Sequence, residues 1–351
     1  MKLSLALFYV FILLNTTTYA QIFFIKGDVK TNKGVPIESA TVFLEGSTQV
    51  TKTNASGEYG FDKLNPGTYT VVVSMLGYSS AKETVIIGTG PIRKDFILND
   101  KSVQLKEVTV GNNFRRKEQM ELFFSMFIGR SDNAISCKIL NPEVIEFSTN
   151  GNLLEATSND FIIIENINLG YRIKYLIRDF RHNNKTRITV YDGSCIFENL
   201  LGSVKQQKKW AKNWLLVYNG SFMHFLRSLY AGNTEEEGFL CDQMSSPPVD
   251  TTLFIDIKKY VSKADSNFIS FNTKSQLRIF YVNKPVLRGE YIKVHYKNIF
   301  ENKRWSYLTM YVDKAVIDKK GSYLSYKSFL LDGDWANKRI GDRLPFEYSP
   351  E

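Results

Sequence analysis

The stretch Thr53-Asn-Ala-Ser-Gly57-Glu-Tyr-Gly-Phe61 combines a tight turn with an alternating strand, and it decides the fold of the first part of the chain. Asn54 and Gly57 accept the backbone angles of a turn, while Tyr59 and Phe61 project to one side of a strand. Similar runs and turns extend on both sides of this stretch. They predict strands at residues 22–30, 40–44, 49–53, 59–61, 67–75, 82–87, 93–98 and 105–110. We therefore expect residues 21–110 to form an N-terminal all-β sandwich of seven to eight antiparallel strands.

The composition excludes several classes of protein. The chain has 351 residues, and its 25 Phe and 19 Tyr can bury enough apolar surface to exclude a disordered chain. With only 3 Cys in this length, a disulfide-built mini-protein is excluded as well. Cys137, Cys195 and Cys241 leave two alternatives, because they can form one disulfide with one thiol left over or remain three buried free thiols.

Several motifs within residues 21–110 carry a resemblance to a known module. They are Gly27-Asp-Val, Gly34-Val-Pro-Ile-Glu-Ser-Ala40-Thr-Val, the stretch from Thr53 to Phe61, Leu64-Asn-Pro-Gly67-Thr-Tyr69 and Ser74-Met-Leu-Gly77-Tyr78. This ordered string resembles the carboxypeptidase-regulatory-like domain, a transthyretin-like β-sandwich. The resemblance implies an accessory fold that stands beside a catalytic domain and is not itself catalytic.

The chain lacks the metal ligands of the zinc peptidases that carry this module. Its 3 His are His182, His224 and His295, and none lies in an HxxE or HExxH motif. No CxxC or HxxxH spacing is present either. A zinc carboxypeptidase is therefore excluded, and we expect neither a metal site nor a cofactor.

The first twenty residues have the layout of a secretory signal peptide. Lys2 provides a positive start, residues 3–14 form an uncharged apolar run, and Thr18-Tyr19-Ala20 places small residues at a cleavage site. The alternative is a membrane anchor, but the run is shorter than the ~17 residues that span a bilayer. We expect an exported protein of the periplasm or outer-membrane surroundings, without a transmembrane segment after cleavage.

Residues 111–117 are polar and basic and predict a linker, and residues 118–351 predict an α+β domain of unknown function. Helical periodicity or capping favours helices at residues 118–128, 131–137, 206–218 and 221–231. Extended runs predict strands at residues 144–148, 153–157, 161–166, 171–180, 186–191, 253–257, 277–282, 291–296, 307–312 and 315–317.

Motifs in this second region resemble the C-terminal part of exported Bacteroidetes proteins known only by their regulatory-like domain. They include Phe127-Ile-Gly129, Ile139-Leu-Asn-Pro-Glu-Val144, Tyr218-Asn-Gly-Ser221 and Asp342-Arg-Leu-Pro345. The resemblance implies organisation and source but no activity. Such modules also precede TonB-dependent outer-membrane transporters of Bacteroidetes, and Gln104-Leu-Lys-Glu-Val-Thr-Val110 resembles the segment that follows them there. The remaining chain is too short for a transporter, so a transporter-associated component is a second alternative.

The start of the helix predicted at residues 221–231 holds the sharpest candidate for chemistry. Ser221, His224 and Arg227 follow one another at i, i+3 and i+6, so a serine nucleophile, a histidine base and an anion-binding arginine share one side. An acidic partner could come from residues 235–237 or from Asp242. The sequence Asn219-Gly-Ser-Phe-Met lacks the second glycine of a nucleophile elbow. We therefore favour an N-cap serine, a hydrogen-bonded histidine and a solvated arginine, with no catalytic residue, and keep an exported hydrolase as the alternative.

A basic cluster indicates a partner surface. Lys205, Lys208, Lys209 and Lys212 are interleaved with two tryptophans, and Arg227 is added to this candidate surface. Of the formal net charge of +9, nearly all the excess lies after residue 110. Lysines beside aromatic rings can meet nucleic acid or an anionic lipid or glycan surface, and export disfavours nucleic acid. The plainer interpretation is the solvated face of a helix that buries its tryptophans.

These observations together predict a non-enzymatic cell-envelope protein. The sandwich would act as a docking or spacer module, and the C-terminal domain would bind a protein or glycan partner. A strand edge of the sandwich offers one mode of docking, because it can add a strand of a partner. The oligomeric state and the identity of the partner do not follow from the sequence.

Overall fold

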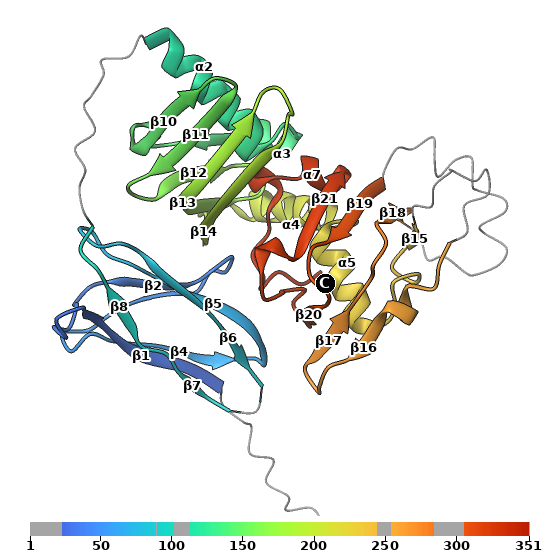
Figure 1. Ribbon diagram of the computed structural model, residues 1–351, viewed down its shortest axis with the longest axis horizontal. Helices are drawn as coiled ribbons and strands as arrows, with labels where there is room; N and C mark the ends of the chain where they lie inside the picture. The colour runs from blue at the N-terminus through green and yellow to red at the C-terminus, as the bar shows by residue number, and fades with distance from the viewer. Residues whose placement is uncertain (1–22, 89, 102–112, 244–253, 284–304, 351) are drawn as a thin grey trace, which may run out of the picture.

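The computed structural model describes residues 23–88, 90–101, 113–243, 254–283 and 305–350. Figure 1 shows three β-rich parts, which we call the sandwich (residues 23–101), the central part (residues 113–199) and the C-terminal part (residues 203–350). Among the described residues, no helix has the length and apolar character needed to cross a membrane. The expected signal peptide and the strands expected at residues 105–110 and 291–296 lie outside the described residues.

The sandwich consists of two sheets. One has β1 between β4 and β7, with β8 also paired to β1, and the other has the order β3-β2-β5-β6. The strands are β1 (Phe23–Thr31), β2 (Thr41–Leu44), β3 (Val50–Lys52), β4 (Glu58–Leu64), β5 (Gly67–Ser74), β6 (Ala81–Ile87), β7 (Ile92–Arg93) and β8 (Phe96–Leu98). The predicted all-β sandwich is confirmed, although the strand expected at residues 93–98 is divided into β7 and β8.

The prediction that all strands are antiparallel is wrong for β7 and β8. Both pair with β1 in the parallel direction, with Ile25 opposite Ile92 and Val29 opposite Phe96. The chain enters β7 from β6, which belongs to the other sheet. Because this connection crosses between sheets and is not a hairpin, nothing forces an antiparallel pair.

Glycine and tyrosine fix the packing between the sandwich sheets. Gly57 has a φ of +78°, as the expected turn requires. A Cβ on Gly27 would lie 1.8 Å from the carbonyl oxygen of Lys94, so only glycine allows this close approach. The buried Tyr59 donates its hydroxyl to the same carbonyl at 2.6 Å. These contacts tie β1 and β4 to the segment between β7 and β8.

The central part is a six-stranded antiparallel sheet with a helix across it (Figure 1). Its order is β10-β11-β13-β12-β9, and β14 pairs with the other edge of β13. The strands are β9 (Cys137–Ile139), β10 (Ile145–Asn150), β11 (Leu153–Ser158), β12 (Ile162–Asn166), β13 (Tyr171–Asn183) and β14 (Thr189–Asn199), with the 3-10 turn η2 (Pro142–Val144) before β10. Phe123 and Phe127 stack with their ring centroids 4.9 Å apart and fill the core of this part.

The helices of the central part differ from their predicted bounds. The helix α2 (Asn113–Phe123) begins within the segment expected to be a linker and continues as the π-helical turn η1 (Phe124–Ile128). Arginine, lysine, glutamate and glutamine are good helix formers, so this polar segment can open a helix. The helix α3 (Asp132–Ile135) has the expected N-cap at Ser131, but it ends early, because Cys137 opens β9.

The C-terminal part contains three helices, several short turns and two small sheets. The sheet orders are β15-β18-β19-β21 and β16-β17-β20. The helices are α4 (Val204–Tyr218), α5 (Phe222–Ala231) and α7 (Asp334–Asn337), and the 3-10 turns are η3 (Ile257–Tyr260), η4 (Tyr326–Ser328) and η5 (Ile340–Asp342). The strands are β15 (Phe239–Gln243), β16 (Val261–Lys263), β17 (Phe268–Phe271), β18 (Leu277–Tyr281), β19 (Trp305–Met310), β20 (Ala315–Asp318) and β21 (Phe329–Gly333).

The sequence predictions for the C-terminal part are mixed. The helices α4 and α5 and the strands β18, β19 and β20 are confirmed within two residues. The strand expected at residues 253–257 is wrong, since residues 254–256 have no regular structure and Ile257 opens η3. The strands β15, β16, β17 and β21 were not predicted.

The turn after β2 joins the sandwich to the central part by backbone pairing. Gly46 donates its N–H to the carbonyl of Cys195 at 2.8 Å, and Phe197 donates to the carbonyl of Ser47 at 2.9 Å. Ser47 and Ile196 thereby form a parallel bridge at the edge of β14. The turn thus adds one isolated bridge to the edge of the central sheet.

Side chains extend this junction on both sides of the bridge. Phe43 is fully buried, and its ring centroid lies 5.8 Å from that of Phe161. Lys82 of β6 pairs with Asp192 of β14 at 3.2 Å. Asp318 of the C-terminal part accepts the N–H of Thr68 at 2.8 Å, so all three parts meet.

The segment that begins just before η5 contacts the sandwich and the central part. Phe346 donates its N–H to the carbonyl of Gly46 at 2.9 Å, and its ring covers that glycine. Asn166 of the central sheet donates its side-chain amide to the carbonyl of Gly341 at 2.9 Å. Residues 339–348 therefore hold the junction together, and we call them the closing segment.

Replacement of Gly46 by alanine tests this junction. Gly46 has a φ of +70°, and an added Cβ would lie 2.7 Å from the ring of Phe346. Gly34 is a matched control, because its φ is +79° and an added Cβ meets nothing within 4 Å. The positive φ alone costs about 1–2 kcal/mol with alanine, so Gly34→Ala should lose about that free energy of unfolding. We expect a larger loss for Gly46→Ala in chemical denaturation, and equal losses would contradict this account of the junction.

Candidate functional site

The start of α5 has the geometry of a capped helix. The hydroxyl of Ser221 accepts the backbone N–H of His224 at 3.1 Å, and Gly232 ends the helix in the left-handed conformation. The apolar side of α5, which includes Phe225 and Leu229, packs in the core of the C-terminal part. The expected N-cap and the expected stop are both present.

The imidazole of His224 is buried and uses both of its nitrogen atoms. Nδ1 accepts the N–H of Gly220 at 3.1 Å, so Nε2 carries the proton and donates to Glu237 at 2.9 Å. The ring stacks on Tyr218 with the centroids 4.6 Å apart. Burial lowers the pKa of His224, and the hydrogen bond with Glu237 opposes that effect. Neither nitrogen is left to take a proton from Ser221.

Arg227 has a role that the sequence did not indicate. Its guanidinium donates to the carbonyl oxygens of Lys320 at 2.9 Å, Tyr348 at 2.7 Å and Phe346 at 3.0 Å. The expected solvated arginine is therefore incorrect, because this side chain binds the closing segment. The remaining acidic candidate, Asp242, pairs with Arg278 at 2.6 Å.

The four lysines of the candidate partner surface lie on the exposed side of α4, whereas Arg227 is engaged elsewhere. Lys205, Lys208, Lys209 and Lys212 are all exposed. Trp210 is buried and Trp214 is half-buried, as the plainer interpretation of this helix expected.

The three cysteines are free thiols and all are buried. Burial raises the pKa of Cys137 to about 12, and it also raises the pKa of Cys195 and Cys241. Since the thiolate is the nucleophile, these side chains behave as small apolar residues.

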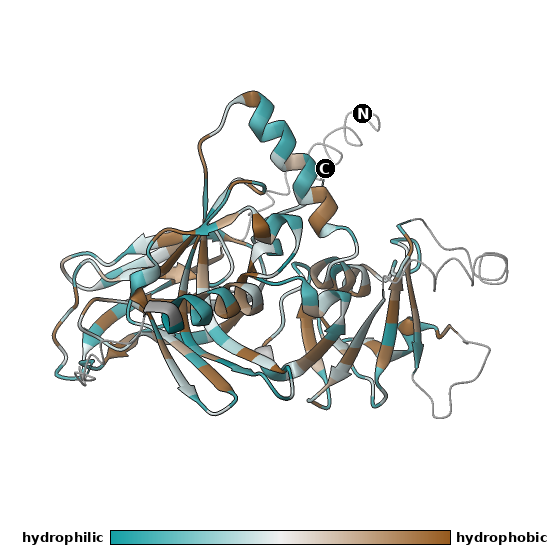
Figure 2. Cartoon of the chain, turned by 90° about the horizontal axis from the view of Figure 1, so that it is seen from above, coloured by the Kyte–Doolittle hydropathy of each residue, from teal (hydrophilic) through white to brown (hydrophobic). Residues whose placement is uncertain are grey.

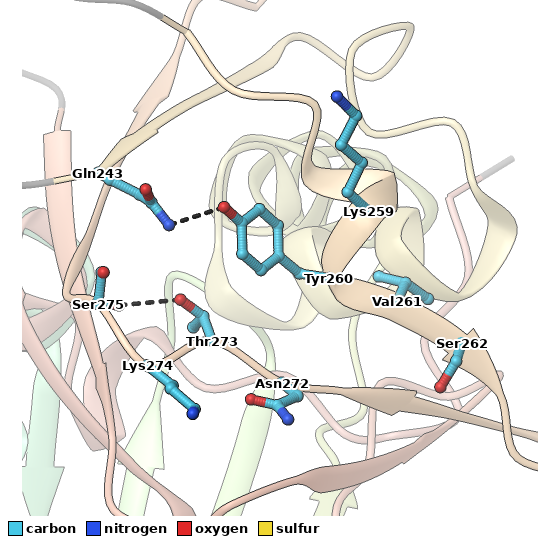
Figure 3. A pocket seen from close by; sticks show the side chains of 9 residues that line it. All are labelled: Gln243, Lys259, Tyr260, Val261, Ser262, Asn272, Thr273, Lys274 and Ser275. Atoms are coloured by element: carbon cyan, nitrogen blue, oxygen red, sulfur yellow. Dashed lines mark hydrogen bonds between the residues drawn. The ribbon is translucent and has the colours of Figure 1, made fainter.

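A pocket of about 380 Å³ opens at the edge of the C-terminal part (Figure 3). A short turn and a strand pair build it. Asp256 caps η3 through the N–H of Lys258, the buried Ile257 anchors the turn, and β16 then pairs with β17. The lining residues are Gln243, Lys259, Tyr260, Val261, Ser262, Asn272, Thr273, Lys274 and Ser275.

Hydrogen bonds hold the centre of this pocket in place. Gln243 donates its amide to the hydroxyl of Tyr260 at 2.7 Å, and Thr273 donates its hydroxyl to the carbonyl of Ser275 at 3.0 Å (Figure 3). The backbone N–H of Asn272 donates to the carbonyl of Tyr260 at 3.0 Å. Within the described residues, no hydrogen bond engages the side-chain amide of Asn272, which is exposed.

The polar groups of the pocket carry a positive balance. Among the residues that the structure describes, its lining includes Lys259 and Lys274 but no carboxylate. Both lysines are exposed, and no carboxylate of the described residues forms an ion pair with them. The pocket thus offers an aromatic ring, amides, hydroxyls and ammonium groups to a polar ligand.

Sequence reasoning did not find this pocket. Its residues come from the end of β15, from η3 and β16, and from the turn after β17, which are separated along the chain. The only local signal is Asn272-Thr-Lys-Ser275, a run of turn formers that also fits an ordinary loop.

Comparison with known protein families identifies the first part of the chain. Residues 25–110 match the model of the CarboxypepD_reg-like domain. The match covers the sandwich that the structure describes, and it agrees with the fold observed there. No curated protein matches this chain in sequence.

Several solved structures show limited similarity. A DUF3823 family protein from Bacteroides ovatus has 10% identity and a TM-score of 0.20, covering 52% of this chain and 82% of its own. The major pilin subunit of Bacillus cereus has 9% identity and a TM-score of 0.21, covering 89% of this chain and 95% of its own. A 3-chlorocatechol 1,2-dioxygenase from Rhodococcus opacus has 9% identity and a TM-score of 0.20, covering 23% of this chain. This chain spans 61% of the length of that dioxygenase.

The buried imidazole of His224 predicts a pH dependence of stability. In the unfolded chain the imidazole titrates near its ordinary pKa of 6.5, whereas burial lowers the pKa in the folded protein. The unfolded state therefore binds more protons below pH 6.5, and the free energy of unfolding falls as the pH falls. We expect urea denaturation at pH 7.5 and pH 5.5 to show a smaller difference for His224→Gln than for the wild type. An unchanged difference would show that the imidazole is not held neutral.

Proposed function

We propose that the protein is a non-enzymatic, exported binding protein of the cell envelope, located in the periplasm or at the outer membrane. The sandwich is a docking module fixed to the rest of the chain, and the C-terminal part binds a glycan. The pocket beside Tyr260 is the observation that carries this proposal.

The chemistry of the pocket favours a sugar. Sugar rings present hydroxyl groups that exchange hydrogen bonds with amides and hydroxyls, while their C–H faces pack on aromatic rings. In the lining, the exposed amide of Asn272 lies below Tyr260, and the hydroxyl of Ser262 lies further to the right (Figure 3). Two lysines at the rim favour a glycan that carries carboxylate or phosphate groups. The volume of about 380 Å³ lies in the range of ligand pockets, at about the size of a mono- or disaccharide.

The same lining argues against cleavage of the glycan. Most glycoside hydrolases use a pair of carboxyl groups on either side of the bond that breaks. No carboxylate of the described part of the chain lines the pocket. The alternative hydrolase site at Ser221 is also disfavoured, because the nitrogen atoms of His224 bind Gly220 and Glu237.

Titration of the full chain with soluble acidic oligosaccharides from envelope polysaccharide tests this proposal. Asn272→Ala and Tyr260→Phe each remove one polar group and keep the fold, so each should weaken binding about 3- to 10-fold. Thr186→Ala is a matched control, since Thr186 lines a different surface pocket of the central part. Equal affinity of all four proteins in calorimetry would overturn the assignment of the pocket.

A Ser221→Ala variant separates the two classes of function. It should bind the oligosaccharides with wild-type affinity, because Ser221 lies outside the lining of the pocket. Release of shorter products by the wild type, and its loss in Ser221→Ala, would instead support the exported hydrolase. Chromatography of the oligosaccharides after incubation gives the readout.

A further inference from the structure

The outward side of α4 carries positive and aliphatic side chains together. Figure 2 shows α4 extending away from the body of the molecule, with hydrophilic turns between hydrophobic ends. Its four lysines are the only charged residues of this helix. Each is exposed, and no carboxylate of the described residues forms an ion pair with any of them.

Large aliphatic side chains stand beside these lysines. Val204 is 68% exposed and Leu216 is 64% exposed, while Leu201, just before the helix, is fully exposed. Successive helical residues are 100° apart, so Val204, Lys208, Lys212 and Leu216 at intervals of four form one exposed row. Val204 and Leu216 stand at the two ends of this row, so exposed aliphatic groups flank the lysines on both sides.

The inner side of α4 fixes the direction of this surface. Three of its side chains donate to three consecutive carbonyls of the turn between β12 and β13. Trp210 donates to Ile167 at 2.8 Å, Asn213 to Asn168 at 2.7 Å and Trp214 to Leu169 at 2.6 Å. Gly170 and Gly202 lie against the Trp210 ring, where any Cβ would clash. The helix can neither roll nor turn its lysines inward without breaking these contacts.

We propose that the outward side of α4, with Leu201, Val204, Leu216 and the four lysines, docks on the surface of an anionic lipid bilayer. The ammonium groups lie among the lipid phosphates, and the aliphatic groups enter the boundary between headgroups and acyl chains. Charge complementarity selects an anionic surface, and the exposed aliphatic groups that flank the lysines select a bilayer over a soluble acidic glycan. This inference goes beyond the glycan pocket, which is built from residues of η3, β16 and the turn after β17.

Flotation of the full chain with vesicles tests the proposal. The vesicles contain phosphatidylcholine and phosphatidylglycerol at 7:3, and pure phosphatidylcholine vesicles are the neutral comparison. We expect binding to the anionic vesicles that weakens with added salt. Each lysine near such a surface contributes about fivefold, so substitution of the four lysines by glutamine should reduce binding roughly a hundredfold or more.

Two further variants make the test specific. The control replaces the exposed Lys33, Lys52, Lys314 and Lys319 by glutamine, which gives the same change of net charge elsewhere and should leave binding within about fivefold of the wild type. Leu201→Ser with Leu216→Ser removes aliphatic groups without a change of charge and should weaken binding at least tenfold. Circular dichroism and the unfolding midpoint establish that each variant is folded.

Competing outcomes are distinguishable. Equal loss of binding in both lysine variants would show that net charge alone acts and would overturn the proposal. Full binding by the Leu201 and Leu216 variant, with stronger capture by soluble dextran sulfate than by vesicles, would assign the face to an acidic glycan instead and also overturn it. The proposed glycan pocket is tested independently of this surface, because Asn272→Ala should not change flotation.

Discussion

The backbone of Gly46 makes both of its hydrogen bonds outside the sandwich. Its N–H binds Cys195 of the central sheet, and its carbonyl accepts from Phe346 of the closing segment. A buried backbone group without a partner costs about as much as a lost hydrogen bond. The sandwich therefore cannot leave the other parts without exposing this turn, and the chain behaves as one body whose parts share their polar groups.

Side chains at the start of α5 likewise form hydrogen bonds with backbone groups. Ser221, His224 and Arg227 look like a catalytic arrangement in the sequence, yet each satisfies a backbone group of the chain. Ser221 accepts an N–H, His224 accepts another, and Arg227 donates to three carbonyls. Spacing along a helix places side chains on one side but does not decide what they face. Here they face the closing segment and a turn. Their hydrogen bonds to backbone groups account for these residue types.

The sequence was most informative where a local rule acts alone. Alternation and turn residues predicted the strands of the sandwich, and a serine N-cap with a glycine stop predicted α5, because neither depends on distant contacts. The prediction of antiparallel pairing was wrong for β7 and β8, since the direction of a strand depends on which sheet the chain enters. The strands β15, β16, β17 and β21 have only three to five residues each, which is too short to show a clear period. The pocket beside Tyr260 combines three separate segments, and no local pattern brings them together.

The closing segment has a consequence for the route by which the chain folds. The pairing of Thr48 with Glu347 spans 299 residues, and the bond between Gly46 and Phe346 spans a similar length. Contacts between such distant positions form slowly, because the intervening chain loses the entropy of a very large loop. The sandwich can form early from local hairpins. The turn at Gly46 stays exposed to solvent until the closing segment packs against it.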